Sequence, residues 1–302
     1  MGSEDKCPLL ENTDFEMIRK IENAFLQASV RDFGAELQSV INKKNHDEYI
    51  WQGQKSIWPR HSPILFPIVG ELKNGFFWYE KQKYFLNRHG FARDMRFEMV
   101  DFSANKVIHQ LMSTEKTRSI FPFDFEFFVG HTLHEKELSI EFIVKNKGNK
   151  MMPFSLGAHP AFTLKAPLDA EILFDKKPKN NPQILKDGLV SAKSVPLVGG
   201  ESLSIDKSTF NQDALLFINT DIKEAILFDH GQKRVKLSFR DMPFLGIWSK
   251  PKAPFVCIEP WQGIADDVHS KNDLFDKKGI QILAPKSEHF CTYKITFYEA
   301  TI

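Results

Sequence analysis

Apolar residues recur at every second position over most of this 302-residue chain. In residues 137–146 (ELSIEFIVKN), the alternating apolar residues are Leu138, Ile140, Phe142 and Val144. The residues between them are polar, with Ile143 as the one exception. A period of two is typical of a strand with one buried face. Because long stretches with the 3.6-residue period of a helix are missing, the pattern favours an all-β protein.

Short strands with turn residues between them indicate how the β-structure is organised. Hairpins are expected to turn at residues 32–34 and 80–83, short helical turns near 114–119 and 207–213, and a surface loop over 178–188. Further strands are expected over 95–101, 106–113, 125–133, 214–219, 224–228, 233–239, 255–259 and 291–299. Such even spacing predicts a sandwich or barrel. The 28 phenylalanines suit the wide core between packed sheets.

The strand pattern begins at Met17 and continues to the C-terminus. Residues 1–16 are therefore expected to be a poorly ordered leader or expression remnant, and residues 17–302 a single domain. The first residues lack the basic start and apolar run of a signal peptide. No stretch approaches the roughly 18 apolar residues that a membrane span needs.

Charge and cysteine usage exclude several classes of partner. Lys and Arg total 40 and Asp and Glu total 39, so the net charge is +1. We therefore expect no nucleic-acid and no membrane partner. Cys7, Cys257 and Cys291 form no CxxC pair, which argues against a disulfide framework and a structural zinc site. A sparse, odd set of cysteines indicates a reducing, cytoplasmic location.

Two polar segments lie beside apolar strands in the first third of the chain. In RHSPILFPIVGEL (60–72), Arg60 either closes an edge strand at the surface or binds oxygen atoms of a ligand. In NRHGFARDMRFE (87–98), His89 and Arg93 flank Gly90. His89 is either an ordinary loop histidine or a ligand contact, and Gly90 would let backbone and ligand approach closely. Both arginines also have local acids within reach in sequence, Asp94 and Glu98.

Two further segments carry ionisable groups at strand ends. In SLGAHPAF (155–162), Pro160 should stop or bulge the strand and turn His159 into a cleft, although a core histidine is the alternative. In FVCIEPWQGIADD (255–267), Glu259 ends an apolar run that Pro260 is expected to stop. Trp261 offers a flat face to the C–H face of a sugar ring. Burying such groups without partners costs roughly 1–3 kcal/mol, so each needs an explanation.

Together these residues point to acid–base chemistry by His159 and Glu259. Their usual pKa values, about 6.5 and 4.3, make the carboxyl group deprotonated and the imidazole switchable at neutral pH. A carboxylate near His159 would favour the protonated imidazole. GxSxG, HExxH and HxH patterns and a glycine-rich phosphate loop are missing, and Cys257 fits a small core residue. We therefore expect neither a catalytic metal nor a cofactor.

These segments resemble, in order, the blocks of the aldose 1-epimerase (galactose mutarotase) family, and most closely its LacX-like branch. The similar blocks, from about Met17 to the C-terminus, are GAELQSV, PILFPIVGEL, RHGFARDMRFE, GAHPAF, DALLF, FLGIW and FVCIEPWQGIAD. The resemblance implies a large antiparallel β-sandwich of the galactose mutarotase-like supersandwich type. It also implies an isomerase of carbohydrate metabolism that binds an aldose in a cleft and interconverts its α and β anomers without a cofactor.

The resemblance also implies residue roles. His159 would be the general acid and Glu259 the general base. The substrate-binding positions would be His89, Asp213 in FNQDALLF, Arg60 before the PILFP block and Arg93, which matches relatives that act on hexose 6-phosphates. The chain departs from galactose mutarotases at GAHPAF and at Glu71, where they carry an arginine. The sugar, free or phosphorylated, and the oligomeric state, monomer or homodimer, are left open.

Three alternatives to a hexose mutarotase follow from the same residues. One is a non-catalytic sugar-binding or regulatory protein on the same fold. Another is a hexose-6-phosphate mutarotase. The third is a glycosidase that pairs Glu259 with Asp266 or Asp267, because glycosidases need two carboxyl groups about 5–9.5 Å apart.

Overall fold

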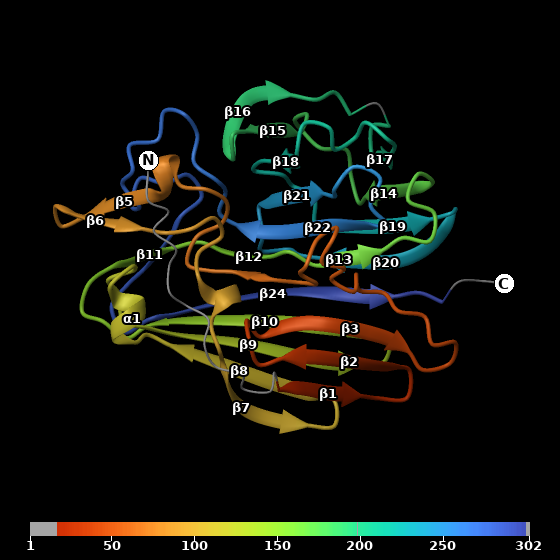
Figure 1. Cartoon of the computed structure of the whole chain (residues 1–302), viewed down its shortest axis with the longest axis horizontal. Coiled ribbons are helices and arrows are strands. Elements are labelled where there is room, and N and C mark those ends of the chain that lie inside the picture. Colours follow the sequence, from red (N-terminus) through yellow and green to blue (C-terminus); the bar gives the residue numbers. More distant parts are fainter. Residues whose placement is uncertain (1–16, 198, 300–302) are drawn as a thin grey trace.

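The computed structural model describes residues 17–197 and 199–299, and its regular structure is almost entirely β-strand (Figure 1). The expected leader, residues 1–16, lies outside the described residues. Every pair of neighbouring strands within the described part of the chain is antiparallel. The all-β prediction is therefore confirmed.

The largest sheet has nine strands, and its central strands β9, β10 and β24 are the longest. Residues 137–146, the segment with the clear period of two, form β10, whose buried positions alternate with partly exposed ones along most of its length. From edge to edge the order is β17 (Ser202–Ile205), β14 (Ala170–Phe174), β19 (Glu224–Asp229), β20 (Gln232–Ser238), β24 (Glu288–Phe297), β10 (Glu137–Asn146), β9 (Phe125–His134), β8 (Lys106–Met112) and β7 (Glu98–Ser103).

The second large sheet has eight strands and carries the longest fully buried strand of the described residues, β22. Its order is β16 (Leu189–Ser194), β15 (Gln183–Lys186), β18 (Leu215–Phe217), β21 (Phe244–Trp248), β22 (Phe255–Gln262), β12 (Leu156–Ala158) and β4 (Ile64–Leu65), with β13 (Ala161–Thr163) also paired to β22. All eight residues of β22 are buried. This burial on both faces explains why β22 reads as an apolar run and lacks a clear alternation.

Smaller elements complete the fold. They are the sheet of β1 (Ile18–Glu22), β2 (Leu26–Arg31) and β3 (Glu36–Asn42), the hairpin of β5 (Phe76–Tyr79) and β6 (Gln82–Phe85), the pair β11 (Met152–Phe154) and β23 (Gln281–Leu283), helix α1 (Glu115–Arg118), and the 3-10 helices η1 (Lys73–Gly75) and η2 (Ala92–Asp94). In the described part of the chain, the helices lack the length and apolarity that crossing a bilayer requires.

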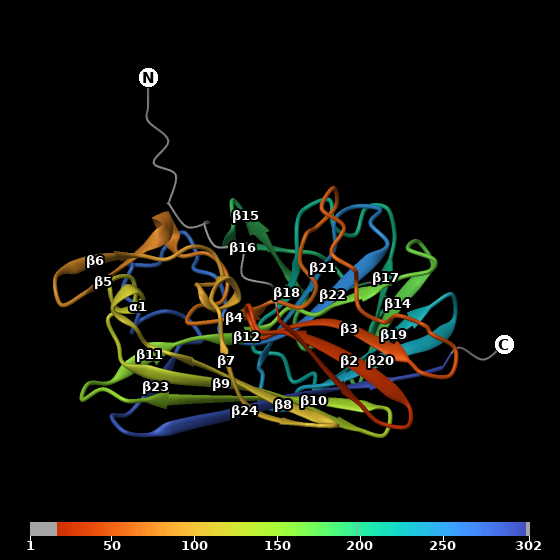
Figure 2. The same ribbon diagram turned by 60° about the horizontal axis from the view of Figure 1, so that its bottom comes forward.

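Phenylalanine fills the space between the layers. In Figure 2, β9, β10 and β24 of the nine-stranded sheet lie below β21 and β22 of the eight-stranded sheet. Phe66, next to β4, stacks on Phe127 of β9 with ring centroids 4.6 Å apart. The largest fully buried side chains are phenylalanines except for Tyr49. A core of large rings between two sheets is what the composition predicted.

Most expected strands exist, with borders shifted by one to three residues, and both hairpins and the short helix at 115–118 are confirmed. Two expectations near loops were wrong. Residues 178–188 contain β15, whose Ile184 is buried. Residues 207–213 form hydrogen-bonded turns, in which the backbone N–H groups of Asn211 and Asp213 donate to the carbonyls of Ser208 and Phe210, and no regular helix.

The expectation that Pro260 stops its strand was also wrong, because β22 continues to Gln262. The backbone N–H of Ile258 donates to the carbonyl of Pro160. Backbone groups alternate along a strand, so the nitrogen of Pro260 faces the same side, toward Ala158 at the end of β12, whose carbonyl accepts a hydrogen bond from the indole N–H of Trp261 instead. A proline is tolerated there because no ladder hydrogen bond is needed.

Candidate active site

The register of three strands brings His159 and Glu259 together. β12 and β13 both pair with β22, and the pairs end at Gly157 and resume at Ala161. The register is the same on both sides of this break, so it sets His159 opposite Glu259. Directly opposed residues of an antiparallel pair share a face of the sheet, with their side chains in contact distance. The strand ends at Ala158, as the proline predicted.

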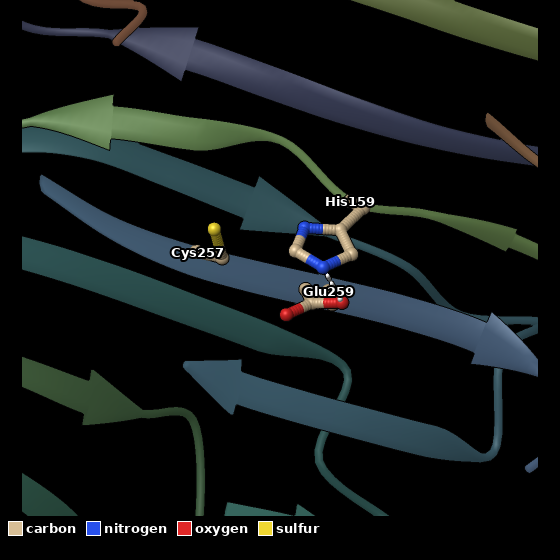
Figure 3. A group of neighbouring side chains, drawn as sticks. All are labelled: His159, Cys257 and Glu259. Carbon is tan, nitrogen blue, oxygen red and sulfur yellow. Dashed lines mark ion pairs between the residues drawn. The ribbon is translucent and has the colours of Figure 1, made fainter. Parts of the chain in front are cut away.

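The two side chains meet in a buried position (Figure 3). Nε2 of His159 lies 3.1 Å from Oε2 of Glu259, and the side chains are 11% and 2% exposed. Nδ1 of His159 and Oε2 of Glu259 have no hydrogen-bond partner among the described residues. Polar atoms that are buried and unpartnered are costly, so this pair marks a place where a ligand can supply the missing partners.

Burial decides the protonation of both groups. It raises the pKa of Glu259 well above its usual range, and the nearby Asp213 raises it further. Burial lowers the pKa of His159 to about 3, with a further lowering by Arg93. The expected protonated imidazole is therefore not favoured, because burial and the charges of Arg93 and Arg60 lower the pKa of His159. The pair as a whole holds one proton over a wide pH range, since both the doubly protonated and the fully deprotonated pair carry a buried net charge.

A cleft of about 180 Å³ opens above this pair, and it contains all seven residues expected at the site. Its lining residues are Trp58, Arg60, Arg88, His89, Arg93, His159, Leu185, Asp213, Ala214, Trp248, Glu259 and Trp261. The convergence of segments around residues 60, 90, 159, 213 and 260 is a finding of the structure. The roles assigned to these residues stay predictions.

His89 presents a defined hydrogen-bond donor. Its Nδ1 accepts a hydrogen bond of 3.1 Å from the backbone N–H of Gly70, so the hydrogen of the neutral ring is on Nε2. Burial lowers the pKa of His89 well below its usual value, which keeps the ring neutral. The ring stands edge-on to His159 with centroids 5.7 Å apart. His89 therefore offers a fixed N–H beside the acid–base pair.

Gly90 allows two backbone segments to approach closely, and the expected approach of a ligand stays a prediction. It has a φ of 72°, and a Cβ here would lie 2.3 Å from the carbonyl oxygen of Phe66. Glycine is the residue that tolerates both the positive φ and this close approach. The contact holds the loop that carries His89 and Arg93 against the segment following β4.

Three arginines line the cleft, of which Arg88 was missed in the sequence. Arg60 pairs with Asp94 at 2.8 Å, and Nη2 of Arg93 donates to the carbonyl of Arg88. Burial lowers the pKa of Arg93 to about 10, and Arg60 lowers it further. Arg88 pairs with Glu71 at 2.9 Å. Arg88 directly precedes His89, but an arginine in a polar loop gives no signal of its own.

Tryptophans form the apolar walls. Trp58 stacks on His159 with centroids 5.1 Å apart and an interplanar angle of 26°, and Trp248 stands edge-on to His159 at 5.9 Å. Sequence reasoning missed Trp58 and Trp248, although both lie in or next to blocks that it quoted. Trp261 lines the cleft as expected. Its ring packs so closely on Gly157 and Gly246 that a Cβ on either would lie 2.6 Å from it.

Asp213 lies in the lining of the cleft, whereas Asp266 and Asp267, the alternative partners of Glu259, lie outside it. Asp213 lines the cleft, has a φ of 72°, and accepts a hydrogen bond from the N–H of Ala214. Asp266 is instead buried in an ion pair with Lys277 at 2.7 Å, and Asp267 lines a different pocket. The expected glycosidase partners of Glu259 are therefore both absent from the cleft lining.

Comparisons with known proteins agree on one family. Residues 17–288 match the family model described as aldose 1-epimerase. The plasmid-encoded protein LacX of Lactococcus lactis subsp. lactis is 30% identical, over 93% of this chain and 99% of LacX.

Solved structures show the same likeness. The galactose mutarotase related enzyme from Lactobacillus acidophilus is 34% identical with a TM-score of 0.88, covering 94% of this chain and 98% of that one. A galactose mutarotase-like protein from Lactobacillus casei is 30% identical with a TM-score of 0.86, covering 93% and 100%.

Proposed function

Because this chain belongs to the aldose 1-epimerase family, we propose that it exchanges the α and β anomers of an aldose in the cleft above His159 and Glu259. The observation that carries the proposal is the 3.1 Å approach of Nε2 of His159 to Oε2 of Glu259. Anomer exchange acts on O1 and O5, two oxygen atoms bonded to the same carbon. An acid and a base that serve both oxygens must lie side by side, as these groups do.

The proposed reaction opens and recloses the sugar ring. Glu259 takes the proton of the O1 hydroxyl group while protonated His159 gives a proton to O5, and the C1–O5 bond breaks. The open aldehyde rotates about C1–C2, and the two residues exchange roles to close the ring on the other face. Each positioned acid or base contributes about 10²–10⁴-fold, so the pair suffices for a large acceleration.

One shared proton serves both steps. Ring opening moves one proton onto Glu259 and another off His159, so the number of protons on the pair is the same before and after. The resting pair with its proton on the carboxyl group and the reactive pair with imidazolium and carboxylate differ only in the position of that proton. The sugar's hydroxyl groups supply the hydrogen bonds that the free pair lacks, which favours the charged form on binding.

The surrounding residues would hold the sugar in one orientation relative to His159 and Glu259. The N–H on Nε2 of His89 and the carboxylate of Asp213 can bind hydroxyl groups, while the tryptophan rings cover the apolar faces of the sugar and exclude water. The stacked Trp58 keeps the imidazole of His159 in one plane. These contacts limit the sugar to poses in which O5 faces the imidazole.

A hexose 6-phosphate is the second candidate substrate, and the arginines favour it. Arg60, Arg88 and Arg93 all line the cleft, whereas a neutral sugar needs no cluster of positive charge. Guanidinium groups bind phosphate oxygens through paired N–H donors. Each arginine contacts a carboxylate, but only two carboxylates, on Asp94 and Glu71, balance the three charges.

Polarimetry tests the proposed activity. The purified chain should accelerate the change in optical rotation of freshly dissolved α-glucose or α-galactose, or the anomer exchange of a hexose 6-phosphate measured by NMR. Binding of a sugar in calorimetry without any acceleration would instead support the sugar-binding alternative. The glycosidase alternative predicts release of reducing ends from oligosaccharides, and the positions of Asp266 and Asp267 outside the cleft argue against it.

A further inference from the structure

We propose that His159, Cys257 and Glu259 form a binding site for a thiophilic divalent cation such as Zn²⁺, and that the bound ion inhibits the enzyme. The binding rests only on the geometry of these three side chains. The inhibition rests in addition on the proposed function. Neither the family assignment nor the proposed reaction involves Cys257.

The three side chains converge because of strand geometry. Cys257 and Glu259 are two residues apart on β22, so they point to the same face of the sheet. His159 lies opposite Glu259 across the break between β12 and β13. One ligand atom from each residue lies within 4.8 Å of the other two, and all three residues are buried. Figure 3 shows the imidazole and the thiol on the same side of the β22 ribbon.

The donor set selects the class of metal. An imidazole nitrogen, a thiolate sulfur and a carboxylate oxygen are ligands that Zn²⁺ accepts together. Mg²⁺ and Ca²⁺ prefer sites made of oxygen ligands. Bonds of about 2.0–2.3 Å place neighbouring ligands of a tetrahedral Zn²⁺ about 3.5 Å apart. The separation of 3.1 Å between His159 and Glu259 is close to this value, and the thiol of Cys257 lies within 4.8 Å of both ligand atoms.

The surroundings leave room for an ion and for a fourth ligand. Oε2 of Glu259 accepts no hydrogen bond among the described residues and faces Nε2 of His159 at 3.1 Å, so an ion between these atoms replaces this one contact. The 180 Å³ cleft borders both residues and gives an ion a path from solvent and a water ligand. Within residues 17–197 and 199–299, no other group of three His, Cys, Asp or Glu side chains converges in this way.

Binding of the ion would release two protons and occupy both the acid and the base, which explains the inhibition. The ion takes the places of the thiol proton and of the proton that His159 and Glu259 share, and both protons leave to solvent. The acid and the base are then both bonded to metal, so neither can exchange a proton with O1 or O5. Sugar and ion therefore compete for the same two side chains, and the inhibition should be competitive with sugar.

Cobalt titration of the metal-free full-length chain tests the binding without reference to activity. Co²⁺ bound by a thiolate absorbs in the near ultraviolet. All proteins carry Cys7→Ser, so that this thiol contributes nothing. The band should appear in the otherwise unchanged chain, disappear in Cys257→Ala, and persist in Cys291→Ala, where another buried thiol is removed. A missing band, or one that persists in Cys257→Ala, would overturn the proposal.

Inhibition of anomer exchange tests the consequence. Zn²⁺ should inhibit the Cys7→Ser protein competitively, and Cys257→Ala should raise the inhibition constant, measured against that variant's own metal-free rate, by at least about tenfold. Equal inhibition of both proteins would contradict the role of Cys257. If the cobalt band appears as predicted but the metal-free chain does not accelerate anomer exchange, the metal site stands and the proposed function fails. The two failures are therefore distinguishable.

Discussion

Nε2 of His159 and Oε2 of Glu259 lie 3.1 Å apart although the residues are a hundred positions apart in the chain. The common register of β12 and β13 on β22 sets the two residues opposite one another, and the backbone N–H of His159 is held on the other side by the carbonyl of Pro63. A strand pairing thus delivers a buried acid–base pair to the floor of a cleft. The predictions below follow from this pair and its surroundings.

The pH dependence of kcat/KM should report a pair that holds one proton over a wide range. Burial lowers the pKa of His159 to about 3 and raises that of Glu259. The second proton is therefore bound only in strong acid, and the shared proton is lost well above the usual range of a carboxyl group. We expect kcat/KM to be constant through neutral pH. It should fall only at pH values well below about 6.5, the usual pKa of a histidine. An acid limb centred near pH 6.5 would show that His159 titrates as an ordinary histidine.

Trp58 should act as a positioning residue for His159. Its indole stacks on the imidazole at 5.1 Å, so its removal frees the ring to rotate and admits water. Trp58→Ala should lower kcat by about tenfold or more, with a smaller change in KM, and Trp58→Phe should restore most of the loss. Steady-state kinetics on the two variants measure this split.

A matched control is Trp78→Ala, which removes an indole exposed on β5 outside the cleft. It should leave the kinetics unchanged. If Trp58→Ala raises KM without lowering kcat, Trp58 contacts the sugar and does not orient His159.

The arginines of the cleft should distinguish phosphorylated from free hexoses. Arg60→Gln should lower kcat/KM for a hexose 6-phosphate by about tenfold or more and change the value for the free hexose little, because only the phosphate uses the guanidinium charge. Added salt should lower kcat/KM for the phosphorylated substrate more than for the free hexose, because salt screens the charges. Arg118→Gln removes an arginine of α1 that pairs with Asp124 outside the cleft and serves as the control. Equal losses for both substrates in Arg60→Gln would rule out phosphate binding by this residue.

Much of the fold follows from the period of two, and part of the site follows from polar residues at strand ends. His159 and Glu259 stand out because an ionisable group beside a proline interrupts an apolar run. Trp58 and Trp248 do not stand out, because a tryptophan among apolar residues looks the same in a core and in a cleft wall. Only the pairing of distant strands separates these two environments.

The protonation state of His159 and Glu259 could not be predicted from the sequence either, because it depends on burial by segments that are distant in the chain. A carboxylate near a histidine raises the histidine pKa in water, and that was the expectation. Burial reverses the sign, since it lowers the pKa of His159, and Arg93 and Arg60 lower it further. Proximity of the two residues can be guessed from family blocks, but the degree of burial depends on Trp58, Trp248 and other side chains from separate segments.

A buried histidine outside the cleft should make the fold sensitive to acid. His131 on β9 is 2% exposed, and burial lowers its pKa to about 3. Between pH 6.5 and 3 the unfolded chain takes up a proton at this residue and the folded chain does not, so stability falls with pH. His131→Leu should reduce the loss in free energy of unfolding between pH 7 and pH 5 by about 2 kcal/mol.

Urea unfolding at the two pH values measures this difference. His134→Leu replaces an exposed histidine of the same strand and should leave the pH dependence unchanged. A loss of stability between pH 7 and pH 5 that is the same in His131→Leu as in the unmodified protein would show that His131 protonates equally in the folded and unfolded states.

The rate of anomer exchange in variants of the central pair tests the account most directly. His159→Asn and Glu259→Gln keep the size of each side chain and remove its acid–base function. On the aldose that the unmodified chain turns over, each variant should lose at least about 10²-fold in the enzyme-catalysed rate, and the double variant should lose little more, because the two residues act as a unit. Circular dichroism should show that all three are folded. Folded variants that exchange anomers at the unmodified rate would contradict the assignment of His159 and Glu259 as acid and base.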